Sequence, residues 1–439
     1  ETPVAGPDLD AAALAATPAA AIIGEAAVIP AFIVEVERRT HLLTHGRTRI
    51  EVSFVTGQII AGGRTEEIAE LELELMSGSR ATLFALAREL QGKAALTLAF
   101  ASKAERGYRL AGHDGLAAIK ARQSAIGPQT STGEAFQILA REALIQVAGN
   151  VHLLSRAQNP DVLHQARVGL RRLRAALAVF KPMLDAEGLA AARAETRWLA
   201  GEMSPARDLD VFLARQPARD DIEESPGRAA FLRVLRLARA EAYERALAAM
   251  RSDRYRALLL TTAEWIEAGA WRRPPDSERA GLPERPIADL AGLALDRFAR
   301  RVRKPSRRFM RLDAAARHNL RKRVKKLRYA SAFFSEVFPQ HPKRRSRFAA
   351  ALGAVQDRLG ELNDLAVARA VAAQVAGGRT GEIAFAAGEE VGRLAGAEEA
   401  LLARADKALR ALRRADVWWP KSTPGPEDLN ISRPRLRSA

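Results

Sequence analysis

The chain has 439 residues and a mass of 47.7 kDa, which is enough for more than one hydrophobic core. It contains 69 Lys and Arg against 52 Asp and Glu, giving a net charge of +17 and a pI of about 10.8. It has no cysteine, which excludes disulfides and thiolate metal sites. A positive surplus of this size indicates a polyanionic partner: nucleic acid, acidic lipid or an inorganic phosphate chain.

The beginning of the chain carries no targeting pattern. Its longest charge-free run, Ala11 to Gly24, contains Pro18 and follows acidic residues instead of a basic segment. We therefore expect neither a secretory signal nor a membrane span, no membrane partner, and a cytoplasmic location. The chain starts at Glu1 without an initiator Met, so we expect an N-terminally truncated or processed product.

Charge divides the chain into two parts. Residues 1–115 hold 11 Lys and Arg against 15 Asp and Glu, a net charge of −4, and residues 116–439 carry the remaining net +21. We expect residues 1–115 to form one domain, 116–132 a linker, 133–419 a helical domain with two repeats (133–271 and 286–419), and 420–439 a disordered tail.

The first part is predicted to be α+β with antiparallel strands. Residues Thr48 to Phe54 alternate in polarity, Thr56-Gly57-Gln58 is expected to be a turn, and the segment from Ile59 to Arg64 is expected to complete a hairpin. A helix is predicted from Arg80 to Leu90, followed by a strand from Leu96 to Lys103. Between them, the segment Glu70 to Leu75 alternates Glu and Leu, so three carboxylates share one strand face.

Carboxylates at alternate strand positions suit hard divalent cations such as Mg²⁺ or Mn²⁺, which take oxygen ligands and share phosphate oxygens. Arg64, Lys103 and Arg106 are nearby cations that suit phosphate. The alternative interpretation is a solvent-facing strand with its acids on the wet side. Residue 55, directly before Thr56-Gly57, is a valine, so it adds no further carboxylate to these acids.

The second part is predicted to be almost entirely helical. Ser131 and Glu134 have the spacing of a capping box in front of a long apolar-periodic stretch. Breaks are expected at 159–160, 181–182, 215–227, 272–286, 338–342 and 377–378, where Pro, Gly and polar residues gather.

An internal repeat carries most of the basic signal. A histidine followed by cations at +3, +7, +8 and +10 occurs at His164 and again 154 residues later at His318. The first copy comprises His164, Arg167, Arg171, Arg172 and Arg174. The second comprises His318, Arg321, Lys325, Lys326 and Arg328, with Arg323 as an additional cation where the first copy has Gly169. We therefore expect the first copy to bind anions more weakly.

Each copy is predicted to be an amphipathic helix with one cationic face and one apolar face. At 100° per residue the His and the cations at +3, +7 and +10 fall within about 80°, opposite the leucines. Residues 300–328 contain 14 Lys and Arg and one acid, Asp313. Repulsion of this density must be offset by a bound anion or by acids elsewhere in the fold, so we expect a ligand in preference to a merely solvated face.

Each copy is followed by an Asp-Leu pair, Asp208-Leu209 and Asp364-Leu365. We expect Asp208 and Asp364 to be helix caps or partners of the arginines in preference to catalytic acids.

The repeated His, Arg and Lys helices resemble the CHAD domain, the conserved-histidine α-helical domain. That resemblance implies two helical bundles related by pseudo-twofold symmetry whose basic surface binds inorganic polyphosphate. The segments Ile50 to Phe54, Ala61 to Arg64, Glu70 to Leu75 and Ser102 to Tyr108 together resemble the second half of a CYTH domain, the triphosphate tunnel metalloenzyme fold. The opening Glu-x-Glu-x-Lys strand of that family is not present.

The expected fold is thus α+β and multidomain: a partial antiparallel β-barrel followed by an all-α pair of helical bundles. From the CYTH resemblance, Glu70, Glu72 and Glu74 would be metal ligands for Mg²⁺ or Mn²⁺ in a complete tunnel. Lys103, Arg64 and Arg106 would neutralise a triphosphate substrate during metal-assisted hydrolysis. With half of the tunnel missing, we expect this chain to be inactive as a triphosphatase.

Three functions remain open. The first joins a triphosphatase-like module to a polyphosphate-binding helical module. The second is a polyphosphate-binding protein without catalysis. The third is a nucleic-acid binder, which we rank lowest because few aromatic residues other than Tyr329 accompany the basic helices as stacking platforms.

Overall fold

A computed structural model describes residues 6, 10–24, 28–112, 117–122, 124–216, 226–272, 281–377 and 381–420. The chain forms two compact units. The first comprises residues Glu1–Ser77 and Ala101–Gly115, and the second Gly78–Phe100 and Leu116–Ala439. The tail expected over 420–439 lies, from residue 421 onward, outside the described residues.

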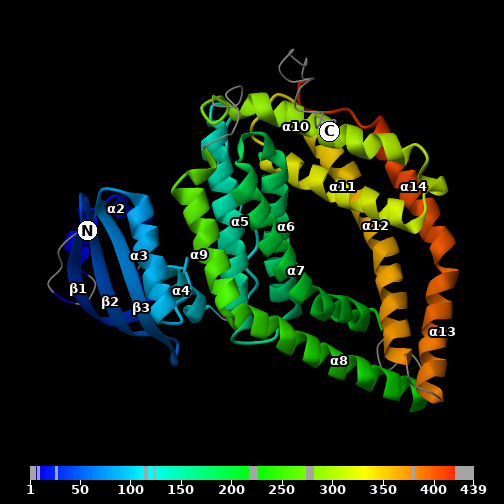
Figure 1. Ribbon diagram of the computed structural model, residues 1–439, viewed down its shortest axis with the longest axis horizontal. Helices are drawn as coiled ribbons and strands as arrows, with labels where there is room; N and C mark the ends of the chain where they lie inside the picture. Colours follow the sequence, from blue (N-terminus) through cyan, green and yellow to red (C-terminus); the bar gives the residue numbers. More distant parts are fainter. Residues whose placement is uncertain are drawn as a thin grey trace, which may run out of the picture. The chain divides into compact units, whose positions relative to one another are not determined.

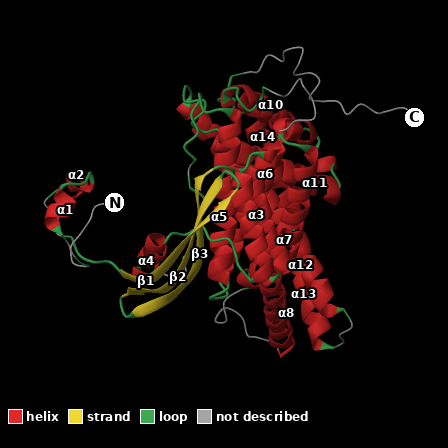
Figure 2. Ribbon diagram, turned by 60° about the vertical axis from the view of Figure 1, so that its left-hand side comes forward, coloured by secondary structure: helices red, strands yellow, loops and turns green. Residues whose placement is uncertain are grey.

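The first unit is an open antiparallel sheet with one helix on it. Two short helices, α1 (Ala11–Ala15) and α2 (Ala19–Ile23), precede the strands β1 (Ile33–His45), β2 (Thr48–Ala61) and β3 (Arg64–Ser77), which pair in the order β1-β2-β3. Helix α4 (Lys103–Ala111) lies on one face of this sheet (Figure 2). The antiparallel α+β expectation is confirmed, and the described strands do not close into a barrel.

The hairpin predicted at Thr56-Gly57-Gln58 is wrong, because β2 runs straight through these residues. Gly57 has a φ of 152°, and a Cβ at this position would lie 2.0 Å from the carbonyl oxygen of Glu35 on β1. This glycine therefore permits a close approach between two strands instead of making a turn. The turns lie at Gly46, with a φ of 60°, and at residues 62–63.

The strand predicted from Leu96 to Lys103 is also wrong. Residues 95–102 have no assigned secondary structure and pair with no described strand, and Lys103 is the first residue of α4, which the Ser102 side chain caps. Leu98 and Phe100 alternate as strand residues do, yet they pack against the helical core of the second unit. Alternation alone therefore could not distinguish a strand from a packed loop segment.

The second unit is helical. Its longer helices are α3 (Arg80–Lys93), α5 (Thr132–Leu154), α6 (Pro160–Val179), α7 (Ala186–Ala214), α8 (Pro226–Arg251), α9 (Asp253–Glu267), α10 (Ile287–Ser306), α11 (Ala314–Phe333), α12 (Pro342–Ala376), α13 (Glu382–Gly396) and α14 (Glu398–Arg414). Short 3₁₀ turns follow α6, α9 and α10 at Lys181–Met183, Ala270–Arg272 and Phe309–Arg311. None of the described helices is long and apolar enough to cross a bilayer.

Most helix ends follow the expected signals. Ser131 caps α5 by accepting from the Glu134 amide at 3.2 Å, and Asn159 caps α6 ahead of Pro160. Helices also end or begin at the breaks predicted near 181, 215, 286, 342 and 377. Two breaks were not predicted, one between α8 and α9 at Ser252 and one between α13 and α14. No Pro or Gly marks the break at Ser252.

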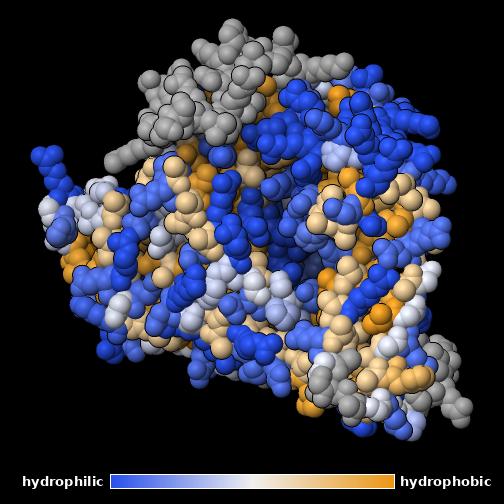
Figure 3. Space-filling model, turned by 45° about the vertical axis from the view of Figure 1, so that its right-hand side comes forward, coloured by the Kyte–Doolittle hydropathy of each residue, from blue (hydrophilic) through white to orange (hydrophobic). Residues whose placement is uncertain are grey.

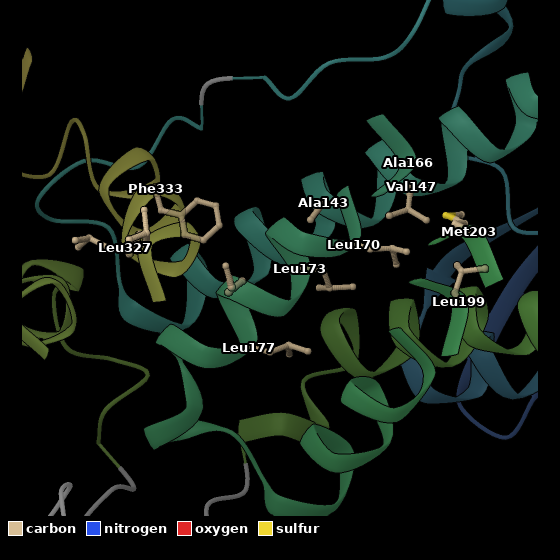
Figure 4. Packing of buried hydrophobic residues seen from close by; sticks show 14 of the residues in the cluster. Ala143, Val147, Ala166, Leu170, Leu173, Leu177, Leu199, Met203, Leu327 and Phe333 are labelled. Atoms are coloured by element: carbon tan, nitrogen blue, oxygen red, sulfur yellow. The ribbon is translucent and has the colours of Figure 1, made fainter. Parts of the chain in front are cut away.

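Two sets of helices repeat the same packing. Helices α5, α6 and α7 pack consecutively, and so do α10, α11 and α12 (Figure 1). Figure 4 shows the α5–α6 contact, where Ala143 and Val147 meet Ala166 and Leu170. The apolar positions of α6 reappear buried in α11 at the same 154-residue interval: Ala166, Leu170, Leu173, Ala176 and Phe180 against Leu320, Val324, Leu327, Ala330 and Phe334.

Gly169 belongs to this packing. A Cβ there would lie 2.8 Å from Val147 Cγ2 and 3.1 Å from the Ala143 carbonyl oxygen, so glycine allows α6 to approach α5 closely. The equivalent Arg323 is exposed and donates to the Arg301 carbonyl oxygen at 3.4 Å. This repeat position faces the neighbouring helix of each bundle, so the reason given for a weaker first copy does not hold.

Candidate functional site

A large cleft opens in the second unit, and its walls come from both repeats. It has a volume of about 1360 Å³. Figure 3 shows hydrophilic side chains around a hollow on one face of the molecule. The two histidines, His164 and His318, line the same cleft, as do both Asp-Leu acids, Asp208 and Asp364. The two stripes predicted from the repeat are therefore brought together.

The amphipathic design of α6 and α11 places these side chains. Leu170 and Leu173 on α6, and Val324 and Leu327 on α11, are almost fully buried on the opposite side from the cations. This burial fixes the rotation of each helix about its axis. The cations at +3 and +7 of each copy consequently face the cleft.

Eight of the eleven residues predicted to bind polyphosphate line the cleft, and three do not. The eight are His164, Arg167, Arg171, Arg172, His318, Arg321, Lys325 and Arg328. Arg174, Arg323 and Lys326 are absent from its wall. The cleft also contains cations that the repeat pattern did not single out: Arg122, Arg207 and Arg345. Arg207 stood next to Asp208 in the repeated motif and could have been included on that ground.

Arg172 lines the cleft from a buried position. Its guanidinium donates to Gln146 Oε1 at 3.2 Å and to Glu142 Oε2 at 3.4 Å, both on α5. Its Cζ also lies 6.0 Å from the centre of the Phe333 ring. These contacts satisfy most of its charge within the protein, so Arg172 supports the wall more than it offers a free cation.

Side chains of α11 and α12 form a hydrogen-bonded group at the second histidine. Asn363 Oδ1 lies 3.1 Å from His318 Nδ1 and accepts from Arg321 Nη1 at 3.0 Å. Both Arg321 and Arg167 have a buried Nε without a hydrogen-bond partner among the described residues. These two arginines are equivalent in the repeat, and an oxyanion in the cleft is the kind of group that would satisfy such donors.

The two repeated acids are not helix caps, since each lies inside a helix, α7 or α12. Asp364 accepts from Arg215 at 2.8 Å, an arginine outside the two repeated stripes. Burial raises the pKa of Asp208, with the nearby Asp364 carboxylate adding to the effect, against the opposing charges of Arg167 and Arg321. The two acids therefore sit among the cations of both repeats.

Burial, together with neighbouring cations, shifts the pKa values of two residues in the cleft. Burial and the neighbouring Arg207, Arg171 and Arg167 lower the pKa of His164 to about 4, so this histidine is neutral near pH 7. Burial and the charges of Arg321, Arg171 and Arg167 lower the pKa of Lys325 to about 7. The cleft therefore carries less positive charge near pH 7 than its number of basic residues alone would give.

In the first unit, α4 places cations over the acids of β3. Lys103 Nζ lies 2.8 Å from Glu70 and also contacts Glu72, and the hydrogen bond from Lys103 lowers the pKa of Glu72. Arg106 Nε lies 2.6 Å from Glu66 and its Nη1 contacts Glu70. The predicted cations Lys103 and Arg106 and the predicted ligands Glu70 and Glu72 therefore bind one another.

Other predicted residues of this unit lie apart from that network. Arg64 donates to the Gly112 carbonyl oxygen at 2.8 Å at the far end of β3, and Glu74 is exposed. Arg38 lies 2.9 Å from Glu72 but was not predicted, because β1 itself was not recognised in the sequence. Val55 is fully buried beside Ile59 and Ile68, so it contributes to a small apolar cluster on the same face.

The acids of β3 do not fit a metal ion in this arrangement. Their oxygen atoms suit Mg²⁺ or Mn²⁺ chemically, but Glu70 and Glu72 are occupied by Lys103, Arg106 and Arg38. Within the described part of the chain, three or more potential ligands nowhere converge as a metal cluster.

Two repeated helical halves around a shared basic cleft define a class of helical protein with an internal repeat. The CHAD domain model matches residues 138–373, and the CYTH domain model matches residues 6–108. The chain therefore belongs to the CHAD family and carries a CYTH domain ahead of its CHAD domain. The architecture expected from the two resemblances is confirmed.

Individual proteins resemble each part separately. The crystal structure of the CHAD domain from the plant Ricinus communis is 28% identical, with a TM-score of 0.59, covering 69% of this chain and 99% of that one. PptA from Streptomyces chartreusis is 21% identical with a TM-score of 0.47, covering 64% and 99%. An inorganic triphosphatase of Haemophilus influenzae is 38% identical over 81 residues, which are 18% of this chain and 23% of the relative. The chain thus matches about a quarter of that curated relative.

Proposed function

We propose that the cleft of the helical unit binds inorganic polyphosphate. The observation that supports this most directly is the convergence of both cationic stripes on one cleft, with Arg167, Arg171, Arg321 and Lys325 facing it together. A linear phosphate polymer carries one charge per phosphate along its length, so it can contact the cations of both repeats at once. Arginine guanidiniums add paired hydrogen bonds to phosphate oxygens.

Polyphosphate is favoured over single-stranded nucleic acid by what the cleft lacks among its described residues. Stacking of bases needs exposed aromatic faces. Of the aromatic residues on the wall, Phe333 and Trp418 are buried, and Tyr329 stacks against Phe333. The cleft wall therefore has cations that can contact phosphates, but few exposed aromatic faces on which nucleic-acid bases could stack.

The test is a variant that removes the cleft cations of the second copy, Arg321→Gln/Lys325→Gln/Arg328→Gln. We expect its affinity for long-chain polyphosphate to fall by about 100-fold at moderate salt, and the slope of log affinity against log salt to flatten. Circular dichroism should show unchanged helicity. A matched control is Arg233→Gln/Arg236→Gln/Arg245→Gln, three exposed arginines on α8.

Two outcomes would overturn the proposal. One is retained affinity in the cleft variant, or an equal loss in the α8 control. The other is displacement of polyphosphate by duplex DNA or RNA at equal phosphate concentration and moderate salt, which would favour a nucleic-acid ligand.

A second candidate function concerns the CYTH domain, because its sequence is similar to an inorganic triphosphatase. The acids and cations of β3 and α4 are the residue types that hold metal and triphosphate in such chemistry. In this chain they bind one another, which favours a helical polyphosphate-binding function without hydrolysis. Phosphate release from tripolyphosphate with Mg²⁺ or Mn²⁺, lost in Glu72→Ala, would establish the enzymatic alternative.

A further inference from the structure

The described segment that leads into α5 is fastened to this helix, although it has no assigned helix or strand. We call residues 117–122 and 124–126 the α5 strap. Ile119 is held by both of its backbone polar groups. Its amide donates to Asn150 Oδ1 at 3.0 Å, and its carbonyl oxygen accepts from Asn150 Nδ2 at 2.9 Å. One side chain of α5 thus bonds the strap as a residue of a neighbouring antiparallel strand would.

Asn150 is a fully buried side chain whose hydrogen bonds the strap completes. Its Nδ2 also donates to the Gln146 carbonyl oxygen at 2.7 Å. A buried amide without partners is unfavourable, so the two bonds to Ile119 favour one register of the strap over others. Sliding the strap by one residue would break both of them.

The second copy of the repeat has no amide at the equivalent position. The pattern of buried residues in α5 recurs in α10 at an interval of 155, for example from Val147 to Val302. The same interval takes Asn150 to Pro305, whose side chain has no hydrogen-bonding group. The packing of the repeated helices therefore does not require the amide of Asn150, whereas the strap does.

A second anchor follows further along the strap. Ser124 Oγ donates to Glu142 Oε2 on α5, and Ile126 is almost fully buried in the helical core. The same oxygen of Glu142 accepts from Arg172 Nη2 at 3.4 Å. Since Arg172 lines the cleft, one carboxylate of α5 holds both the strap and a cation of the cleft wall.

Arg122 lies between the two anchors and lines the cleft. Its side chain is exposed, and so is that of Lys120, which is not among the residues of the cleft wall. The bonds at Ile119 and Ser124 fix the backbone on either side of Arg122. They therefore determine which part of the cleft its guanidinium can reach.

The strap is held by few contacts for its length. Ile126 is the one described residue of the strap that is buried, and most of the others are exposed: Ala117, Lys120, Ala121, Arg122 and Ala125. Ordering each backbone residue costs conformational entropy, and segments with few buried side chains open at low free energy. We therefore expect the strap to leave α5 far more readily than the helices unfold.

We propose that fastening of the α5 strap is coupled to occupancy of the cleft. Arg122 contacts the bound anion, and Asn150 and Glu142 are positioning residues that hold Arg122 there. The inference rests on the proposed function for the identity of that anion. An anion that contacts Arg122 stabilises the fastened strap, so it binds more weakly once the strap is released, because coupling between two equilibria is reciprocal.

The first measurement compares two cations of the strap in the full chain, with long-chain polyphosphate as the probe at moderate salt. Arg122→Gln should lower the affinity about 5- to 10-fold. Lys120→Gln removes the same charge from the same segment outside the cleft wall, and its affinity should stay within about 2-fold of wild type. No loss in Arg122→Gln, or an equal loss in both variants, would overturn the proposal.

Hydrogen exchange measured by mass spectrometry follows the strap itself. The Ile119 amide is bonded to Asn150, so it is protected while the strap is fastened. Saturating polyphosphate should slow its exchange about 5- to 10-fold in wild type and in Lys120→Gln, and should not slow it in Arg122→Gln. Slowing that persists in Arg122→Gln would mean that the ligand does not hold the strap through this side chain.

A double-mutant cycle tests the positioning role of Asn150. Asn150→Ala leaves every residue of the cleft wall in place, yet it should lower polyphosphate affinity about 5- to 10-fold. Adding Arg122→Gln should then have little further effect, because a released strap no longer holds the guanidinium in the cleft. A merely structural role of Asn150 predicts that Arg122→Gln costs the same in both backgrounds. Since Arg122 is exposed, the tests on Arg122→Gln do not depend on whether Asn150→Ala folds.

The cleft variant Arg321→Gln/Lys325→Gln/Arg328→Gln separates this inference from the proposed function. If that variant loses affinity while Arg122→Gln does not, the cleft binds polyphosphate and the strap takes no part in it. If the cleft variant keeps the affinity of wild type, the proposed function fails, and the inference about the strap fails with it.

Discussion

Arg171 on α6 donates a hydrogen bond from Nε to the hydroxyl of Tyr329 on α11 across 3.1 Å. This bond joins the two repeats at the cleft wall, and the Tyr329 ring stacks on Phe333 with the ring planes 28° apart. Each stripe is therefore held in place by contact with the other copy as well as by its own apolar face.

Tyr329→Phe tests whether this bond is structural. The change removes one hydrogen bond to a charged donor, so the free energy of unfolding should fall by about 1–2 kcal/mol in chemical denaturation. Polyphosphate affinity should stay within about 3-fold of wild type, because Arg171 keeps its charge. A loss of more than 10-fold would mean that the hydroxyl contacts the ligand itself.

Lys325 should make polyphosphate binding depend on pH. Its pKa is lowered to about 7 by burial and then by Arg321, Arg171 and Arg167, with Asp364 opposing them. A bound polyanion favours the charged ammonium, so binding takes up a proton above pH 7 and none well below it. Affinity should fall as pH rises past 7, by up to about 10-fold per pH unit.

Lys325→Arg is the matching control, because arginine stays charged throughout this range. Its affinity should be nearly constant between about pH 6 and about pH 8.5, the span over which wild type changes. Calorimetry in buffers of different ionisation enthalpy measures the proton uptake directly. His164, with a pKa of about 4, does not titrate in this window. Absence of proton uptake by wild type at pH 8 would show that Lys325 does not meet the ligand.

The helices of the second unit and the direction of their cationic faces were largely predictable from the sequence, because both follow from local periodicity. Leucines at helical spacing fix which side of α6 and α11 is buried, so the +3 and +7 cations had to face away from the core. The positions +8 and +10 lie nearer the edge of that face, and their surroundings depend on the neighbouring helix. Arg172 and Lys326 show this, since Arg172 donates to Glu142 on α5, whereas burial and then neighbouring cations lower the pKa of Lys326.

The first unit was harder to predict because sheet pairing is not local. Gly57 is a residue type typical of turns, but here it allows β1 to lie close to β2. That role depends on the partner strand and cannot be predicted from the residues next to Gly57. The ion pairs of Lys103 with Glu70 and Glu72 likewise depend on how α4 lies on the sheet. The sequence analysis singled out these three residues, but it did not predict that they pair with one another.

The two copies should contribute comparably to the cleft. Gly169 packs against α5 and takes no part in the cleft wall, so its lack of charge does not weaken the first stripe. Arg167→Gln/Arg171→Gln and Arg321→Gln/Lys325→Gln should therefore reduce long-chain polyphosphate affinity to within about 5-fold of each other near pH 6, where Lys325 is charged. A much smaller effect of the first pair would restore the asymmetry expected from sequence.

Removing one acid from the cleft should strengthen anion binding. Asp208 lies among Arg167, Arg321 and Arg207, and its raised pKa shows that burial, together with Asp364, opposes its charge. Asp208→Asn keeps the shape and removes a negative charge, so polyphosphate affinity should rise about 3- to 10-fold at low salt and less at high salt. Weaker binding would mean that Asp208 orients Arg167 or Arg321 for the ligand.

The ion pairs between α4 and the acids of β3 can be tested for whether they exclude a metal ion from the sheet. Lys103 lies against Glu70 and Glu72. Burial alone would lower the pKa of Lys103, but the hydrogen bonds to these two carboxylates outweigh burial and raise it. Lys103→Gln leaves these carboxylates without their ammonium partner, so Mn²⁺ affinity measured by electron paramagnetic resonance should rise about 10-fold. Lys93→Gln, at an exposed lysine paired with Glu89 on α3, is the control and should not change Mn²⁺ binding. If Lys103→Gln binds Mn²⁺ no better than wild type, the acids of β3 are held by Arg38 and Arg106 firmly enough to exclude a metal from this face.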